Sequence, residues 1–402
     1  MSKLGACIAA LGVVAWVSTA TAAPRAITLK DALAAAARAP AHRVARSQVT
    51  AAAGEVTAAG AWPSTAVGIS SSRSTARLGV VASLPLPVMG TLGADRAVAR
   101  ADLDVARANA SSADGDLARD VTKAWLALAA AEARAALSEQ AAQRQESLVD
   151  IAKARFEAGD APRVDVVTAR AGAARAHADA DADAASIDSA SAELAALLGW
   201  DPTARLRADG GVPAPTDVPP LATLRERRRG HPQARAAAAR VDAEAARVRQ
   251  VRASHRPSLS LDLESLFDDP TLPGNDYRIG VTVELPLLGK GSAARDAAVA
   301  RRHLAKAERD ATLNAIDGAI VATYNRYRAA AARARALADK VLPSERRAAE
   351  LARTAYREGQ GGLVTVVEAE RALADAEAQA SEARAQAARA RAELVWAAGG
   401  SL

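Results

Sequence analysis

Two stretches decide the fold: Ser258-Leu259-Ser260-Leu261-Asp262-Leu263-Glu264 and Arg278-Ile279-Gly280-Val281-Thr282-Val283-Glu284-Leu285, in which apolar and polar residues alternate. Such alternation predicts β-strands with one apolar and one polar face. The residues between them are rich in Asp, Pro, Gly and Asn, so we expect a β-hairpin over about 258–286. A soluble sandwich would show the same alternation. However, long alanine-rich stretches flank this hairpin, and an isolated hairpin is marginal in water. It must therefore pair with other hairpins.

A second copy of the pattern lies earlier in the chain. The segment 63–87 contains two alternating runs and predicts another hairpin. Pro87 and Gly90 at its end correspond to Pro286 and Gly289 in the later copy. Such matches predict two tandem repeats of one plan. In each repeat a short helix, a hairpin and a very long helix are followed by a glycine turn and a long return helix.

Glycines and prolines mark the expected boundaries. A helix capped by Thr28 should run toward Ala61 with a bend near Pro40, and Pro343 predicts a kink in the second long helix. The expected segments are a first repeat at 23–209 with long helices over about 94–157 and 163–198, a linker at 210–220, and a second repeat at 221–402 with long helices over about 292–357 and 363–398.

The first residues predict a secretory signal peptide over 1–22. One lysine precedes an apolar run from Leu4 to Val17, and the small residues Ala20-Thr21-Ala22 suit a cleavage site. Cys7, the single cysteine, lies before that run rather than after it, so we do not expect a lipid anchor. The mature chain should then hold neither disulfides nor thiolate metal sites.

The composition argues against an enzyme and against nucleic-acid binding. Half of the residues are hydrophobic but only 3% are aromatic, and the net charge of +6 is spread along helices, which predicts solvated helix surfaces. The five histidines are scattered without a ligand spacing, so we expect no metal site and no cofactor. Strands of about nine residues suit a tilted membrane-spanning strand, for which ~9–11 are needed, and their polar face suits an aqueous lumen.

Taken together, the chain resembles the outer-membrane efflux (TolC-like) proteins. The resemblance rests on the duplicated plan and on several motifs: Leu285-Pro286-Leu287 with Gly289, Arg155-Phe156-x-x-Gly159, Tyr356-x-x-Gly359 and Leu197-Leu198-Gly199. It implies a mainly α fold with a membrane β-barrel contribution, in which a homotrimer forms one barrel and tunnel from four strands per chain. It implies an exit duct in the outer membrane, surrounded by its lipid, with the helical tunnel in the periplasm. Its partners would be a periplasmic adaptor and an inner-membrane RND-type pump.

The resemblance also implies a gate beside the helix-turn tips at Gly159 and Gly359. Tyr356 matches a gate tyrosine, while Asp165 and Glu368 match acidic positions where the tunnel closes. Rings of carboxylates would favour cations. Asp165 is equally well explained as a carboxylate that complements the dipole at a helix N-terminus.

Two departures weaken a direct transfer of the family's gate. Gly361 and Thr365 stand where the family prototype has a gate arginine and a second acidic ring. The run from Gly90 to Arg100 is more similar to the outer-membrane components of heavy-metal cation efflux systems, and drugs remain alternative substrates. The rival from another class is a secreted or periplasmic alanine-rich coiled-coil protein with a structural or binding role.

Overall fold

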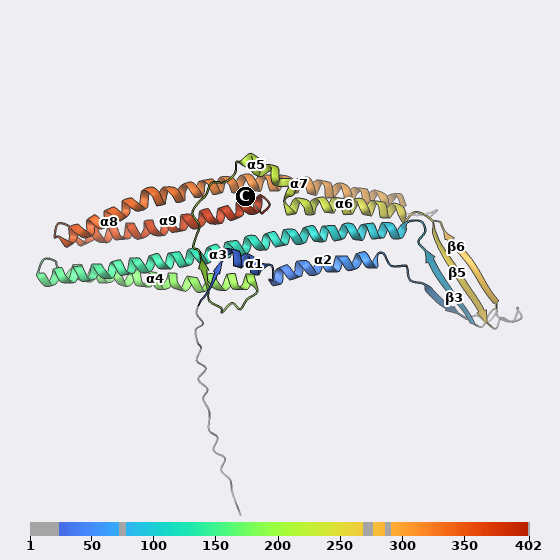
Figure 1. Cartoon of the computed structure of the whole chain (residues 1–402), viewed down its shortest axis with the longest axis horizontal. Coiled ribbons are helices and arrows are strands. Elements are labelled where there is room, and N and C mark those ends of the chain that lie inside the picture. The colour runs from blue at the N-terminus through green and yellow to red at the C-terminus, as the bar shows by residue number, and fades with distance from the viewer. Residues whose placement is uncertain (1–23, 72–77, 268–275, 286–290, 401–402) are drawn as a thin grey trace, which may run out of the picture.

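The computed structural model describes residues 24–71, 78–267, 276–285 and 291–400. The chain is elongated: long helices lie side by side along the main axis, and a β-sheet lies at one end (Figure 1). The signal peptide expected at 1–22, and the matched Pro286 and Gly289, lie outside the described residues. Among the helices in these ranges, none combines the length and the apolar character that a membrane-spanning helix requires.

The helices account for most of the chain, in agreement with the expected mainly α fold. Their bounds are α1 (Leu29–Ala36), α2 (Pro40–Ala58), α3 (Thr91–Ala158), α4 (Arg163–Leu198), α5 (Leu221–Glu226), α6 (Pro232–Ala253), α7 (Gly291–Ala336), α8 (Leu342–Arg357) and α9 (Leu363–Ala397). Helix α3 has 68 residues. At ~1.5 Å per residue it extends about 100 Å, most of the length of the molecule.

The two hairpins combine into one antiparallel sheet with the strand order β2-β3-β5-β6. The strands are β2 (Ala66–Ser70), β3 (Leu78–Leu86), β5 (Ser258–Phe267) and β6 (Asp276–Glu284). β3 pairs with β5 across the repeats, which confirms that the hairpins pair with each other. β2 and β6 form the two edges of this sheet.

Each face of the sheet has a distinct chemistry because side chains alternate along every strand. Cross-strand pairs such as Leu261 with Val281 and Leu263 with Ile279 make one face apolar. Ile279 is 75% exposed in the single chain, so this face is uncovered. On the other face Asp262 accepts hydrogen bonds from the hydroxyls of Ser83 and Thr282, both at 2.5 Å.

A second sheet corrects the expectation that the hairpins supply all the strands. β1 (Arg25–Thr28) pairs in parallel with β4 (Leu206–Asp209), which joins the start of the first repeat to its end. The Trp125 indole N–H donates to the Ile27 carbonyl at 2.9 Å and fixes this sheet against α3. Four residues is the shortest run over which alternation indicates a strand, and β1 does not alternate, so the sequence signal for this sheet is weak.

The expected single helix with a bend near Pro40 is instead two helices, α1 and α2. Proline is favoured at the first position of a helix, so Pro40 begins a new one. The end of α4 abuts this start: a Cβ on Gly199, whose φ is +70°, would lie 2.4 Å from Pro40 Cδ. The second repeat uses the same junction. Gly399, after α9, approaches His231, which precedes α6.

The expected break near Pro343 is confirmed. α7 ends at Ala336, and a π-helical turn over Leu337–Val341 separates it from α8. Pro343 has no backbone N–H to donate to the preceding turn. The wider π-helical turn accommodates this missing hydrogen bond.

Candidate functional site

Two helix turns form the end of the molecule that lies farthest from the sheet (Figure 1). Gly159 ends α3 and Gly359 follows α8, and their φ angles of +83° and +79° lie in the left-handed region. Glycine adopts this conformation without steric penalty, which explains why both turns use it. The two glycines expected at the helix-turn tips therefore occupy equivalent positions in the two repeats.

Tyr356 connects the two turns. Its side chain is fully buried, and its hydroxyl donates to Asp165 Oδ2 at 3.1 Å. Asp165 lies in the first turn of α4, so the contact joins the return helix of one repeat to α8 of the other. Burial, together with the hydrogen bond to Asp165, raises the pKa of Tyr356 to about 12. The phenol is therefore neutral at physiological pH and remains a hydrogen-bond donor.

Arg155 reinforces this connection from α3. Its Nη1 donates to the Tyr356 carbonyl oxygen at 2.8 Å, and its guanidinium lies 4.6 Å from the centroid of the tyrosine ring. Nη2 also donates to the Asp160 carbonyl at 3.0 Å. The sequence identifies Arg155 only as part of the turn motif Arg155-Phe156-x-x-Gly159. Arg155-Phe156 in the first repeat corresponds to Ala355-Tyr356 in the second. This correspondence places Arg155 near the turn and was the signal that could have identified it.

The structure does not bring Glu368 into this cluster. It lies exposed on α9 and forms neither a hydrogen bond nor an ion pair with any described residue. Of the three expected gate residues, Tyr356 and Asp165 are therefore in contact, while Glu368 stands alone on the surface of one chain. No group of three or more His, Cys, Asp or Glu within the described ranges could hold a metal ion.

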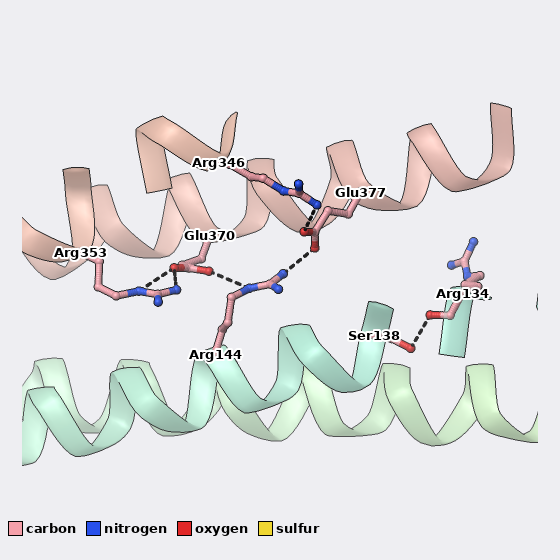
Figure 2. A network of polar contacts seen from close by, with 7 residues as sticks. All are labelled: Arg134, Ser138, Arg144, Arg346, Arg353, Glu370 and Glu377. Carbon is pink, nitrogen blue, oxygen red and sulfur yellow. Dashed lines mark hydrogen bonds and ion pairs between the residues drawn. The ribbon is translucent and has the colours of Figure 1, made fainter. Parts of the chain in front are cut away.

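A second polar cluster joins α3, α8 and α9 through ion pairs between arginines and glutamates (Figure 2). Glu370 and Glu377 on α9 are only 2% and 6% exposed. Arg144 reaches both from α3: its Nε lies 3.3 Å from Glu370 Oε2, and its Nη2 donates to Glu377 Oε2 at 2.8 Å. One arginine of the first repeat therefore holds two buried carboxylates of the second.

Helix α8 completes these contacts. Arg353 donates to Glu370 through Nε at 3.0 Å and also through Nη2, and Arg346 Nη2 lies 3.5 Å from Glu377 Oε1. The result is an alternating arginine–glutamate chain: Arg353, Glu370, Arg144, Glu377 and Arg346. Burying a carboxylate costs free energy unless it is paired with a positive charge. These ion pairs therefore restrict how α3, α8 and α9 can move relative to one another.

The arginine–glutamate chain also corrects the sequence analysis. The interspersed charges predicted solvated helix surfaces, but here they lie between helices. In a sequence, a carboxylate on the surface of a helix looks the same as one at a helix contact. Only the packing of α3 on α9 distinguishes them.

Comparison with known proteins agrees with this architecture. The family model described as "Outer membrane efflux protein" matches residues 33–200 and 224–400. The cobalt-zinc-cadmium resistance protein CzcC of Cupriavidus metallidurans is 24% identical over 291 residues, which cover 72% of this chain and 69% of CzcC.

Solved structures share the fold over almost the whole chain. The outer membrane protein VceC of Vibrio cholerae is similar with a TM-score of 0.76 and 21% identity, covering 93% of this chain and 96% of VceC. CusC, whose structures concern transmembrane channel formation, has a TM-score of 0.78 and 17% identity, covering 93% and 92%. Because the family model spans both repeats, the chain belongs to the outer membrane efflux protein family.

Proposed function

We propose that this protein is the outer-membrane exit duct of a tripartite efflux system. It would passively conduct substrates to the outside from a periplasmic adaptor and an inner-membrane RND-type pump, which supplies the energy. The observation that carries this proposal is the four-stranded sheet, with one apolar face, one polar face and two edges. The same chain continues directly from β3 into α3, a helix about 100 Å long.

The edges and faces of the sheet support a homotrimer. A sheet edge presents unpaired backbone groups, and closing a barrel is the arrangement that removes edges altogether. Three copies joined from β6 to β2 would turn the apolar face, including Val67, Ile69 and Ile279, toward lipid. The polar face, including Asp262, would then line a water-filled lumen. The long helices would continue this wall as a tunnel in the periplasm.

We place the gate of this duct at the tips near Gly159 and Gly359. Tyr356 and Asp165 hold neighbouring helices of one chain together, and the exposed Glu368 carries a free carboxylate. Around a threefold axis, Asp165 and Glu368 would each form a ring of negative charge that attracts cations. Substituting Asp165→Ala and Glu368→Ala together should raise single-channel conductance in planar bilayers and reduce the preference for cations.

A matched control removes two exposed carboxylates elsewhere. Asp296→Ala with Glu308→Ala changes the charge by the same amount on α7, far from the turns. It should leave conductance and ion preference unchanged. If both double variants behave like the unmodified protein, the tip carboxylates do not form the constriction.

Among substrates, the proposal favours divalent metal cations over drugs. The support is the similarity to CzcC, a protein named for cobalt, zinc and cadmium resistance. Deleting the gene in its own host should lower the tolerated concentrations of these metals, and restoring it should recover them. If only hydrophobic drugs become more toxic, the duct serves a drug pump instead, and the metal assignment fails.

A further inference from the structure

A cavity of about 410 Å³ lies where the two repeats and the linker meet. Its walls come from α1, α3 and α9, and Pro213 to Thr216 of the linker also line it. Leu29, Leu33 and Leu126 are among its apolar residues. Its volume falls in the range of small-molecule pockets, about 300–1,000 Å³, which are mostly apolar with a few converging polar groups.

Hydrogen bonds and an ion pair fix the linker to α7 beside this cavity. The Thr216 N–H donates to the Tyr327 hydroxyl at 3.0 Å, and that hydroxyl donates in turn to the Thr216 carbonyl. Asp217 forms an ion pair with Arg335 on α7 at 3.0 Å. These contacts fix the linker against the second repeat, so the position of this wall of the cavity is set by the fold.

Two of the polar groups in the lining are already satisfied. His231 Nδ1 accepts from the Gln233 N–H at 3.2 Å, so its Nε2 carries the proton and donates to the Trp396 carbonyl at 3.2 Å. Burial lowers the pKa of His231, which keeps the ring neutral. Arg119 stacks on Trp396 at 4.7 Å and forms ion pairs with Asp116 and Asp120.

Arg391 on α9 is different. Its Nε atom is buried and has no hydrogen-bond partner. Among the described residues, Arg391 also has no ion pair, although it lines the cavity. A buried cationic N–H without an acceptor costs free energy, and such a group requires an explanation. The cavity thus combines an apolar lining with one uncompensated positive charge.

We propose that this cavity binds an amphipathic organic monocarboxylate, with its carboxylate on Arg391 and its apolar body against Trp396 and Leu126. A carboxylate on the Nη end of the guanidinium supplies the negative charge that Arg391 lacks among the described residues. The apolar body replaces water along the remaining walls. The occupant of this cavity would contact both repeats at once, because α3 and α9 both line it.

The direct test uses the full-length protein in lipid nanodiscs. Isothermal titration with 4-phenylbutyrate should give saturable binding with one site per chain. Its neutral counterpart, 4-phenylbutan-1-ol, should bind at least tenfold more weakly. Arg391→Met should remove this difference between the two compounds. Non-saturable uptake, or equal affinities for the acid and the alcohol, would overturn the proposal.

Two glycines provide a matched pair of cavity-filling variants. Gly115 in α3 lines the cavity, and a Cβ there would meet no atom within 4 Å. Gly115→Leu should therefore fill the cavity without a backbone clash and abolish binding. Gly318 in α7 has equally open surroundings but does not line the cavity, so Gly318→Leu should bind normally.

Gly115→Leu and Gly318→Leu should both retain the fold, since replacing glycine within a helix raises helix propensity. Circular dichroism and conductance check that the variant proteins are intact. Two results overturn the proposal even if the protein conducts normally. One is unchanged binding in Gly115→Leu. The other is no saturable binding by the unmodified protein, as expected if a neighbouring copy fills the cavity.

Discussion

Replacing Arg144 by methionine should loosen the contact between α3 and α9. Methionine keeps much of the apolar stem but removes the charge that joins Glu370 and Glu377. Breaking a buried ion pair costs about 3–5 kcal/mol, because the partner charge is left buried. Glu370 keeps Arg353, and Glu377 keeps a longer contact with Arg346. The lower end of this range, about 3 kcal/mol, is therefore the expected loss.

Hydrogen exchange measures this loss locally, which matters because large proteins often unfold irreversibly. Since about 1.4 kcal/mol corresponds to tenfold, amides over 370–378 of α9 should exchange about 100-fold faster in Arg144→Met. Amides over 387–397, at the far end of the same helix, serve as the internal reference. The matched control is Arg371→Met, because Arg371 is exposed and has no ion pair among the described residues.

A further variant separates lost attraction from stranded charge. Adding Glu370→Gln and Glu377→Gln to Arg144→Met removes both buried negative charges, so part of the protection should return. The reasoning is refuted if Arg144→Met changes exchange over 370–378 by less than threefold. It is also refuted if Arg371→Met has the same effect, or if 387–397 loses protection equally.

Three further predictions concern the junctions and the tip. Gly199→Ala should lower the temperature of the unfolding midpoint more than Gly159→Ala. Both variants place a non-glycine residue in the left-handed region, which costs about 1–2 kcal/mol. Only at position 199 would the added Cβ also clash with the Pro40 ring. Equal changes in the two midpoints would contradict the close approach of Gly199 to Pro40. Burial lowers the pKa of His231 from its ordinary value of 6.5, so its contribution to stability is present above about 6.5 and is lost as pH falls through the folded-state pKa. Between pH 7 and pH 5 the melting temperature of the unmodified protein should therefore fall more than that of His231→Asn, which can still cap α6. An equal fall in both proteins would count against this prediction. Tyr356→Phe should destabilise the tip by about 1–2 kcal/mol and increase channel openings in bilayers. The pKa of Tyr356 is raised from 10.0 to about 12, so its stabilising contact with Asp165 should be fully present below about pH 10 and be lost as pH rises through 12. Hydrogen exchange at the tip should show this transition in the unmodified protein but not in Tyr356→Phe.

Features encoded locally could be predicted from the sequence. Alternation identified both hairpins, and the break at Pro343 follows from the missing amide of proline. Gly159 and Gly359 marked the turns because left-handed backbone favours glycine. These signals depend on a few neighbouring residues and not on which helices meet.

Features that depend on distant contacts were missed. The β1–β4 sheet joins two four-residue strands from opposite ends of a repeat. β4 alternates over only four residues, the shortest run that indicates a strand, and β1 does not alternate. The arginine–glutamate chain requires knowing which face of α3 meets α9. Tyr356 and Asp165 were singled out by resemblance, and the structure shows their contact. The signal peptide and the exact limits of the repeats stay predictions.

The central claim is that three copies of this chain form a duct in the outer membrane. Cell fractionation followed by electrophoresis with and without boiling tests it most directly. The account predicts a protein in the outer-membrane fraction that needs detergent for extraction and migrates as a trimer until boiling releases single chains. A monomer released into the periplasmic extract without detergent would contradict the account and favour an alanine-rich coiled-coil protein instead.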